Sequence, residues 1–264
     1  ECDSAQAQRA TYLTNLSAIL ADAGENDGAV AAAREAASCT FPSTSMPLYE
    51  SNLGVALRAR YQATGDRQSL DEAIGLLRKA HREGAPGGTA ALALGHALND
   101  RYLLIGATED REEALNALRA ATSAMLATPA IKLAGLRSLG AILMAEGRWS
   151  AASAAYSTSV ALLTESVWHG LDRRSKEAEL AGLSSLGTQA CSAALAAGDA
   201  DLALESLEAG RAVIWNQHAA HRPDAARLEG IPDVTITRLV EVGALLSMSE
   251  GRAMWVQNPF DSRL

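Results

Sequence analysis

Aromatic residues, basic charge and long apolar runs are all scarce in this chain, and each scarcity excludes a class of protein. Aromatics make up 4% of the 264 residues, too few for the bulky core of a β-sandwich or barrel. The formal net charge of −8 argues against nucleic acid or an anionic membrane as a partner, because both need a basic surface. No run approaches the roughly 18 apolar residues of a membrane span.

Cysteine is also rare, with Cys2, Cys39 and Cys191 far apart and odd in number. We therefore expect neither a disulfide framework nor a cysteine metal site. This use of cysteine predicts a cytoplasmic protein. The first residues have no basic start and no apolar stretch, so no signal peptide is expected. The last three residues, 262–264, resemble a peroxisomal address, which applies only in a eukaryote.

Alanine and leucine are abundant, and they occur in a repeated pattern. Five times a Leu-Gly or Leu-Ser pair lies in an apolar helical stretch: Leu16-Ser17, Leu53-Gly54, Leu94-Gly95, Leu139-Gly140 and Leu186-Gly187. Another glycine follows each leucine 8, 12, 12, 8 and 12 residues later. The two spacings differ by about one helical turn, so the glycine returns to nearly the same face. Self-similarity at this period indicates a helical-repeat solenoid.

Residues 53–66 and 94–107 match best, because Leu-Gly, Ala-Leu, Arg-Tyr and Gly recur in register. After each glycine, residues 70–80 and 111–121 carry apolar residues at helical spacing. Each unit is therefore predicted to be a helix, a short turn and a second helix. We expect turns at 65–69 and 106–110, with Ser69 and Asp110 as N-caps. Prolines mark the links between units: Pro42, Pro47, Pro86 and Pro129.

This pattern resembles the tetratricopeptide repeat (TPR). Residues 49–80 and the phrase LEAGRAVIWNQ at 207–217 are further similar to the arrays upstream of CHAT protease-like domains. The resemblance covers about residues 10–220 and implies an all-α, right-handed solenoid of about five helix pairs. We expect this array to occupy residues 1–221. Residues 222–264 are expected to hold a linker, a capping helix and a tail.

The CHAT resemblance implies no protease activity here. In that family the catalytic His and Cys lie in a separate domain after the repeats, and we expect no such domain in this chain. Cys191 lies in a predicted repeat helix, among the neighbours of a packed residue. His218 and His221 lack a nearby carboxylate or cysteine, so a solvated helix end is favoured over a metal site.

The concave face is the candidate binding site, because the first helix of each pair lines it in such arrays. The residue before each Leu-Gly pair is expected to point into this groove: Asn15, Asn52, Ala93, Ser138 and Ser185. Peptide-binding tetratricopeptide domains use Asn there, and the resemblance implies this role for Asn15 and Asn52. Asparagine both donates and accepts, so it suits an extended peptide backbone.

Further candidates lie on the same helices. Arg58 and Arg137 are suited to a carboxylate, because a guanidinium binds it through two hydrogen bonds. His96 and Asn99 complete the predicted set. The alternative is that the asparagines bind a neighbouring repeat and that the arginines are solvated.

The recurring Arg-Tyr pairs, 60–61 and 101–102, are better explained by packing between units than by ligand binding. We expect each tyrosine to fill the gap between two repeats.

The sequence favours a non-enzymatic scaffold that binds a protein or peptide, without cofactor or metal, in a CHAT-associated signalling or defence assembly. The alternative is a small-molecule sensor or enzyme with an enclosed pocket, where His96, Asn99 and Arg137 face the ligand. A third interpretation is self-association through the C-terminal helix.

Overall fold

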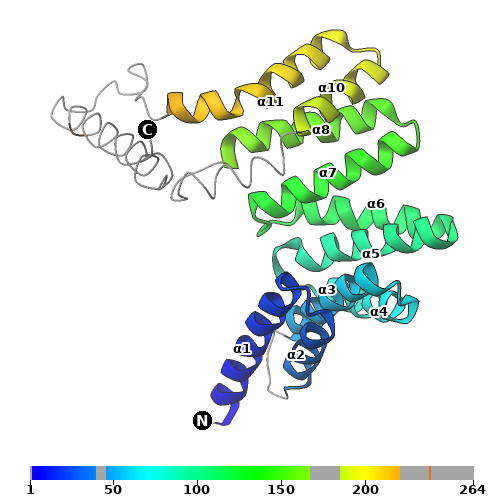
Figure 1. Cartoon of the computed structure of the whole chain (residues 1–264). Coiled ribbons are helices and arrows are strands. Elements are labelled where there is room, and N and C mark those ends of the chain that lie inside the picture. The colour runs from blue at the N-terminus through cyan, green and yellow to red at the C-terminus, as the bar shows by residue number, and fades with distance from the viewer. Residues whose placement is uncertain (1, 40–45, 167–184, 221–237, 239–264) are drawn as a thin grey trace, which may run out of the picture. The chain divides into compact units, whose positions relative to one another are not determined.

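The computed structural model describes residues 2–39, 46–166, 185–220 and 238. These ranges contain ten α-helices and one short 3₁₀ turn, and no strand (Figure 1). The helices are α1 (Cys2–Asp22), α2 (Asn26–Ser38), α3 (Met46–Thr64), α4 (Arg67–Arg82), α5 (Thr89–Ile105), α6 (Thr108–Ser123), α7 (Pro129–Ala145), α8 (Trp149–Ser166), α10 (Leu186–Ala196) and α11 (Ala200–Ala220). None of these helices is both long enough and apolar enough to span a bilayer.

The chain divides into two compact units, Glu1–Ala155 and Tyr156–Leu264. The division falls inside α8, at a point where the sequence pattern of the repeat array is unbroken. The first unit contains α1–α7 and the start of α8, and the second contains α10 and α11. The predicted linker, capping helix and tail at 222–264 lie outside the described residues.

Helices of the first unit follow the predicted order of helix, turn and helix. We call α1, α3, α5 and α7 the first helices, and α2, α4 and α6 the second helices. Each second helix packs on its own first helix and on the next one along the chain, as α4 packs on both α3 and α5. Neighbouring first helices also contact each other more closely than neighbouring second helices do.

The Leu-Gly pairs lie where the two helices of a repeat cross. A Cβ added to Gly54 would lie 2.5 Å from Leu77 Cγ, and one added to Gly95 would lie 2.6 Å from Leu118 Cγ. In the second unit a Cβ added to Gly187 would lie 2.9 Å from the Cα of Gly210. The glycine is therefore required because the second helix occupies the space of its side chain. In the first repeat Ser17 takes this position and donates a hydrogen bond to the Ala29 carbonyl at 2.8 Å.

The glycines downstream of the pairs close the turns. All five have a positive φ, between 70° and 83°: Gly24, Gly65, Gly106, Gly147 and Gly198. This left-handed conformation ends a helix and is readily adopted only by glycine. The sequence prediction of a glycine turn in each repeat is confirmed.

The predicted N-caps Ser69 and Asp110 are wrong by three residues. Asp66 caps α4 and accepts a hydrogen bond from the Gln68 N–H at 3.1 Å. Ser69 lies inside the first turn and donates to Asp66 Oδ2 at 2.8 Å. Asp110 is likewise the third residue of α6, whose N-cap position is Ala107. Both predicted residues are buried, and Asp110 pairs with Arg101 of the first helix in its own repeat.

Prolines begin helices instead of separating them at two of the predicted links. Pro129 is the first residue of α7, after Thr128, whose hydroxyl accepts from the Ile131 N–H. Pro47 is the second residue of α3. A missing N–H costs nothing in a first turn. Pro86 lies in the 3₁₀ turn Pro86–Gly88, and Pro42 lies outside the described residues.

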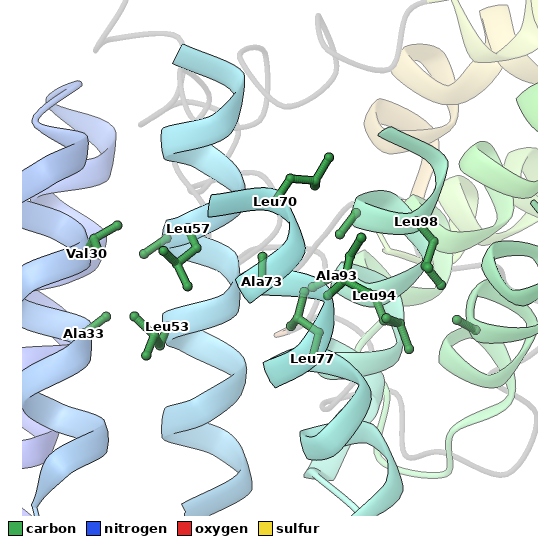
Figure 2. Close-up of a cluster of buried hydrophobic side chains, with 14 of the residues drawn as sticks. Val30, Ala33, Leu53, Leu57, Leu70, Ala73, Leu77, Ala93, Leu94 and Leu98 are labelled. Carbon is green, nitrogen blue, oxygen red and sulfur yellow. The ribbon is translucent and has the colours of Figure 1, made fainter. Parts of the chain in front are cut away.

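One hydrophobic cluster runs from α2 to α6 (Figure 2). Leu57, Leu70, Leu77, Leu94 and Leu98 are almost completely buried in it, and alanines fill the spaces between them. Such a continuous core built from successive helix pairs is expected of a repeat array.

Candidate functional site

Two polar pairs connect successive first helices of the first unit. Arg58 of α3 donates from Nε to Asp100 Oδ2 of α5 at 2.7 Å. On α5, His96 Nε2 lies 2.8 Å from Ser138 Oγ of α7. The two partners in each pair are 42 residues apart. His96 and Asp100 lie one turn apart on α5, so they share a face.

We call Arg58, His96, Asp100, Arg137 and Ser138 the first-helix cluster. Arg137 precedes Ser138, is exposed, and its charge acts on His96. Three first helices thus contribute side chains to one polar strip. The sequence predicted four of these residues but missed Asp100. No spacing in the sequence pointed to it, because the two repeats crossed by these pairs differ in length, with 41 residues from Leu53 to Leu94 and 45 from Leu94 to Leu139.

His96 is held neutral. The pKa of its imidazole is lowered from 6.5 to about 4, mainly by burial and in part by the positive charges of Arg58 and Arg137, while Asp100 opposes them. At neutral pH the ring therefore carries one N–H donor and one acceptor nitrogen. His96 offers hydrogen bonding without charge.

Arg58 already binds a carboxylate, that of Asp100. The two side chains are only 23% and 18% exposed, so water screens the pair less than a surface ion pair. A ligand carboxylate at Arg58 would have to compete with Asp100 or add to it. The carboxylate that Arg58 binds is therefore that of Asp100, a residue of the same chain.

The two predicted asparagines occupy different settings. Asn52 of α3 is half-buried and Asn15 of α1 is exposed. Among the described residues, no hydrogen bond joins either amide to a neighbouring repeat. Both amides retain their donors and acceptor for another molecule. Asn52 lies on the same helix as Arg58, whereas Asn15 lies on a helix that contributes nothing to the first-helix cluster.

Asn99 belongs to a different group of side chains. Its Oδ1 accepts from Arg111 Nη1 of α6 at 3.3 Å. Arg111 also pairs with Glu146 Oε1 at 2.8 Å and lies 4.4 Å from the centre of the Tyr102 ring. This arginine is almost completely buried, so it holds the ends of three helices together. We therefore assign Asn99 to packing and leave it out of the first-helix cluster.

Recurring Arg-Tyr pairs also serve packing, as predicted. Arg101 binds Asp110 at 2.7 Å in its own repeat and Asp71 at 3.0 Å in the preceding one. Arg60 repeats this arrangement with acids 3.0 and 3.7 Å away: Asp27 and Asp66. Each arginine therefore joins two repeats through their acidic residues. Tyr61 packs against the hydrophobic cluster.

The remaining residues considered from the sequence are Cys191, His218 and His221. Cys191 is half-buried in α10 with a free thiol. No cluster of three or more His, Cys, Asp or Glu suited to a metal ion occurs among the described residues. The side chain of His218 and all of His221 lie outside the description.

Comparisons with known proteins support the fold. No family model and no curated protein matches the chain. Among solved structures, MamA matches with a TM-score of 0.50 at 17% identity, over 83% of this chain and 97% of that one. A variant of a putative kinesin light chain with TPR-like repeats from Podosopora anserina matches at 0.52 and 19%, over 81% and 98%.

BtubC (BKLC) from P. vanneervenii matches with a TM-score of 0.51 at 16% identity, over 81% of this chain and 88% of that one. Identities this low establish a shared fold and no shared function. Together with the helix pairs, the Leu-Gly crossings and the glycine turns, these likenesses show that the chain folds as an all-α, TPR-like helical-repeat array.

Proposed function

We propose that the chain is a non-enzymatic scaffold that binds a protein or peptide along its first helices. The observation that carries this proposal is the first-helix cluster, in which Arg58–Asp100 joins α3 to α5 and His96–Ser138 joins α5 to α7. An extended segment laid across α3, α5 and α7 meets hydrogen-bonding side chains once per repeat. Repeat arrays bind elongated partners because their side chains recur in this way.

The cluster suits an extended peptide that carries an acidic group. Asn52 both donates and accepts, as a peptide backbone requires, and the neutral His96 has one ring nitrogen left besides the one that bonds Ser138. Arg58 and Arg137 both place a guanidinium group close enough to act on His96. Charged hydrogen bonds from arginine to a carboxylate are the strongest contacts available on this face. The preferred ligand therefore places an Asp, a Glu or a C-terminal carboxylate near α5 and α7.

A peptide-display screen against the intact chain tests this proposal. Binders should be enriched in acidic residues, and Asn52→Ala and Arg137→Ala should each weaken binding about tenfold, because hydrogen bonds to charged or buried groups contribute about 1.5–3 kcal/mol. The matched control is Arg119→Ala, which removes an exposed arginine from the second helix α6. Equal affinities for all three variants and the parent chain would contradict the proposal.

We further propose that the partner belongs to a signalling or defence assembly with a CHAT protease-like protein. This rests on the resemblance of residues 49–80 and 207–217 to CHAT-associated repeats. Affinity purification of the chain from its source, followed by mass spectrometry, tests it. Stable partners that include a CHAT protease-like protein support the proposal, and stable partners without one contradict it.

Self-association through residues 222–264 stays a prediction, as does a cytoplasmic location. Light scattering compares the whole chain with one that ends at residue 221. A multimer that becomes a folded monomer on truncation confirms the prediction, and identical masses refute it.

A further inference from the structure

Helix α6 buries an arginine at a position that is apolar in the neighbouring repeats. This position is the fifth residue after each turn glycine, and it is no more than 8% exposed in the first four repeats: Ala29, Leu70, Arg111 and Ala152. A charged side chain is costly to remove from water unless it is paired. The groups that bind Arg111 should therefore show what this position gains from a charge.

The guanidinium of Arg111 binds two first helices at once. On α5 it donates from Nη1 to Asn99 Oδ1 at 3.3 Å and lies 4.4 Å from the centre of the Tyr102 ring. On α7 it donates from Nη2 to the Ile142 carbonyl at 3.2 Å and from Nε to Glu146 Oε1 at 2.8 Å. Because a guanidinium is planar and its donors are fixed in direction, these contacts determine how far α7 is shifted along α5.

The repeat pattern alone leaves that shift open. From α3 to α5 the Leu-Gly pairs and the turn glycines are both displaced by 41 residues (53 to 94 and 65 to 106). From α5 to α7 the pairs are displaced by 45 residues (94 to 139) but the glycines by 41 (106 to 147). Matching the pairs and matching the turns therefore differ by about one helical turn. His96 and Ser138 are 42 residues apart, so the structure follows the turns. If α7 slid by one turn toward the other match, Ile142 would replace Ser138 opposite His96.

We propose that Arg111 is a positioning residue that holds α7 in the observed register and so brings Ser138 to His96. On α5, Asn99 follows His96 by three residues. On α7, Ile142 follows Ser138 by four, so Arg111 binds both helices about one turn beyond the pair. Arg111 acts on a ligand only through the first-helix cluster. Its effect on binding therefore rests on the proposed function, whereas its effect on the register does not.

The nuclear Overhauser effect (NOE) between the His96 ring and nearby protons tests the register in the whole chain without ligand. The parent should show an NOE from the ring to the Ser138 β-protons. Arg111→Leu should fold, because leucine is buried at the same position in α4 and because Glu146 keeps another arginine partner. In this variant the NOE should disappear as α7 moves, and a shift of one full turn should replace it with an NOE to the Ile142 methyl groups. An unchanged NOE in the variant, or none in the parent, would overturn the proposal.

A second variant and a matched control separate positioning from a general loss of packing. Arg111→Lys keeps the charge, but a single ammonium group cannot bind both helices as the guanidinium does. It should lose the same NOE, and it decides the question if Arg111→Leu does not fold. Arg78→Leu is the control, because it removes a second-helix arginine that pairs with Glu113 of the next repeat. The control should keep the NOE between His96 and Ser138, and its loss there would overturn the assignment to Arg111.

Affinity for an acidic peptide from the display screen provides a second, independent measurement. Arg111→Leu should weaken binding about tenfold, as Arg137→Ala does, because both remove Arg137 from its place beside His96. Arg78→Leu should bind like the parent chain. A lost NOE with unchanged affinity would contradict the proposed binding site and leave the role of Arg111 in the register supported. A retained NOE overturns that role whatever the affinity.

Discussion

The first and second helices both carry polar pairs from one repeat to the next, but the pairs differ in exposure and chemistry. On the second helices, Arg34–Glu72 at 2.6 Å and Arg78–Glu113 at 2.6 Å are ordinary ion pairs, each with both partners more than a third exposed. On the first helices, the pair Arg58–Asp100 is shielded and the pair His96–Ser138 is neutral. These two second-helix pairs are therefore solvated, whereas the two first-helix pairs are partly buried, as is the pair of Arg111 in α6 with Glu146. Such groups are costly to bury without partners, and here each has one.

Acidification should affect the first helices most. Because the pKa of His96 is lowered in the folded chain, the unfolded chain binds the proton more readily. Stability is therefore full above pH 6.5 and is lost as the pH falls from 6.5 to about 4, by about 3 kcal/mol in all. His96→Gln, which cannot titrate, should remove this loss. Urea unfolding of both proteins at several pH values measures it, and parallel pH profiles would show that His96 is not responsible.

Adding a methyl group at a first-helix glycine should be the next largest effect. The Cβ of Gly95→Ala would lie 2.6 Å from the buried Leu118 and 3.2 Å from a carbonyl oxygen of α6. Overpacking of this kind costs about 1–3 kcal/mol. Urea unfolding should show the variant to be less stable than the parent, and equal midpoints would mean that α5 and α6 do not cross as described.

Removal of Asp100 should cost a similar amount. Asp100→Ala leaves the shielded guanidinium of Arg58 without its carboxylate, which is expected to lower stability by about 1–3 kcal/mol. The same change should strengthen binding of an acidic peptide, since Arg58 becomes available to it. Unfolding and peptide titration together check both effects. Weaker binding by Asp100→Ala would show that the carboxylate itself contacts the ligand.

Substitution of a second-helix glycine should raise the stability of the chain, whereas Gly95→Ala should lower it. Nothing lies within 4 Å of a Cβ added to Gly75 of α4, which is exposed. Gly75→Ala should therefore stabilise the chain by about 0.5–1 kcal/mol, through helix propensity alone. A higher Tm confirms this, and a loss of stability would place a neighbour at this position.

The smallest effect is expected at a second-helix ion pair. Glu72→Ala removes the exposed partner of Arg34, and such pairs contribute about 0–1 kcal/mol. Its unfolding midpoint should match that of the parent in high salt. A loss comparable to that of Asp100→Ala would erase the difference between the two helix sets.

Repetition explains how much could be predicted from the sequence. The Leu-Gly pairs recur because the helix crossing admits only a very small residue, and the turn glycines recur because the helix ends in a left-handed conformation. Both features could therefore be predicted from the sequence. The caps of α4 and α6 depend on the exact residue at which a helix begins, and Ser69 and Asp110 lie about one turn too far along. Asp66 and Ala107 are the true N-cap positions.

Only part of the first-helix cluster could be predicted from the sequence, and the reason is geometric. Periodicity places Arg58 and His96 on first helices but does not tell how far one first helix is shifted along the next. That shift decides that Arg58 meets Asp100 and that His96 meets Ser138. It also turns Asn99, the neighbour of Asp100, toward Arg111. No internal pattern in the sequence distinguished these two adjacent residues.

Hydrogen exchange with a bound peptide ligand from the display screen tests the central claim most directly. We predict slower exchange on binding in α3, α5 and α7, centred on residues 52–58, 96–100 and 137–138, with little change in α2, α4 and α6. Protection confined to the second helices would contradict it.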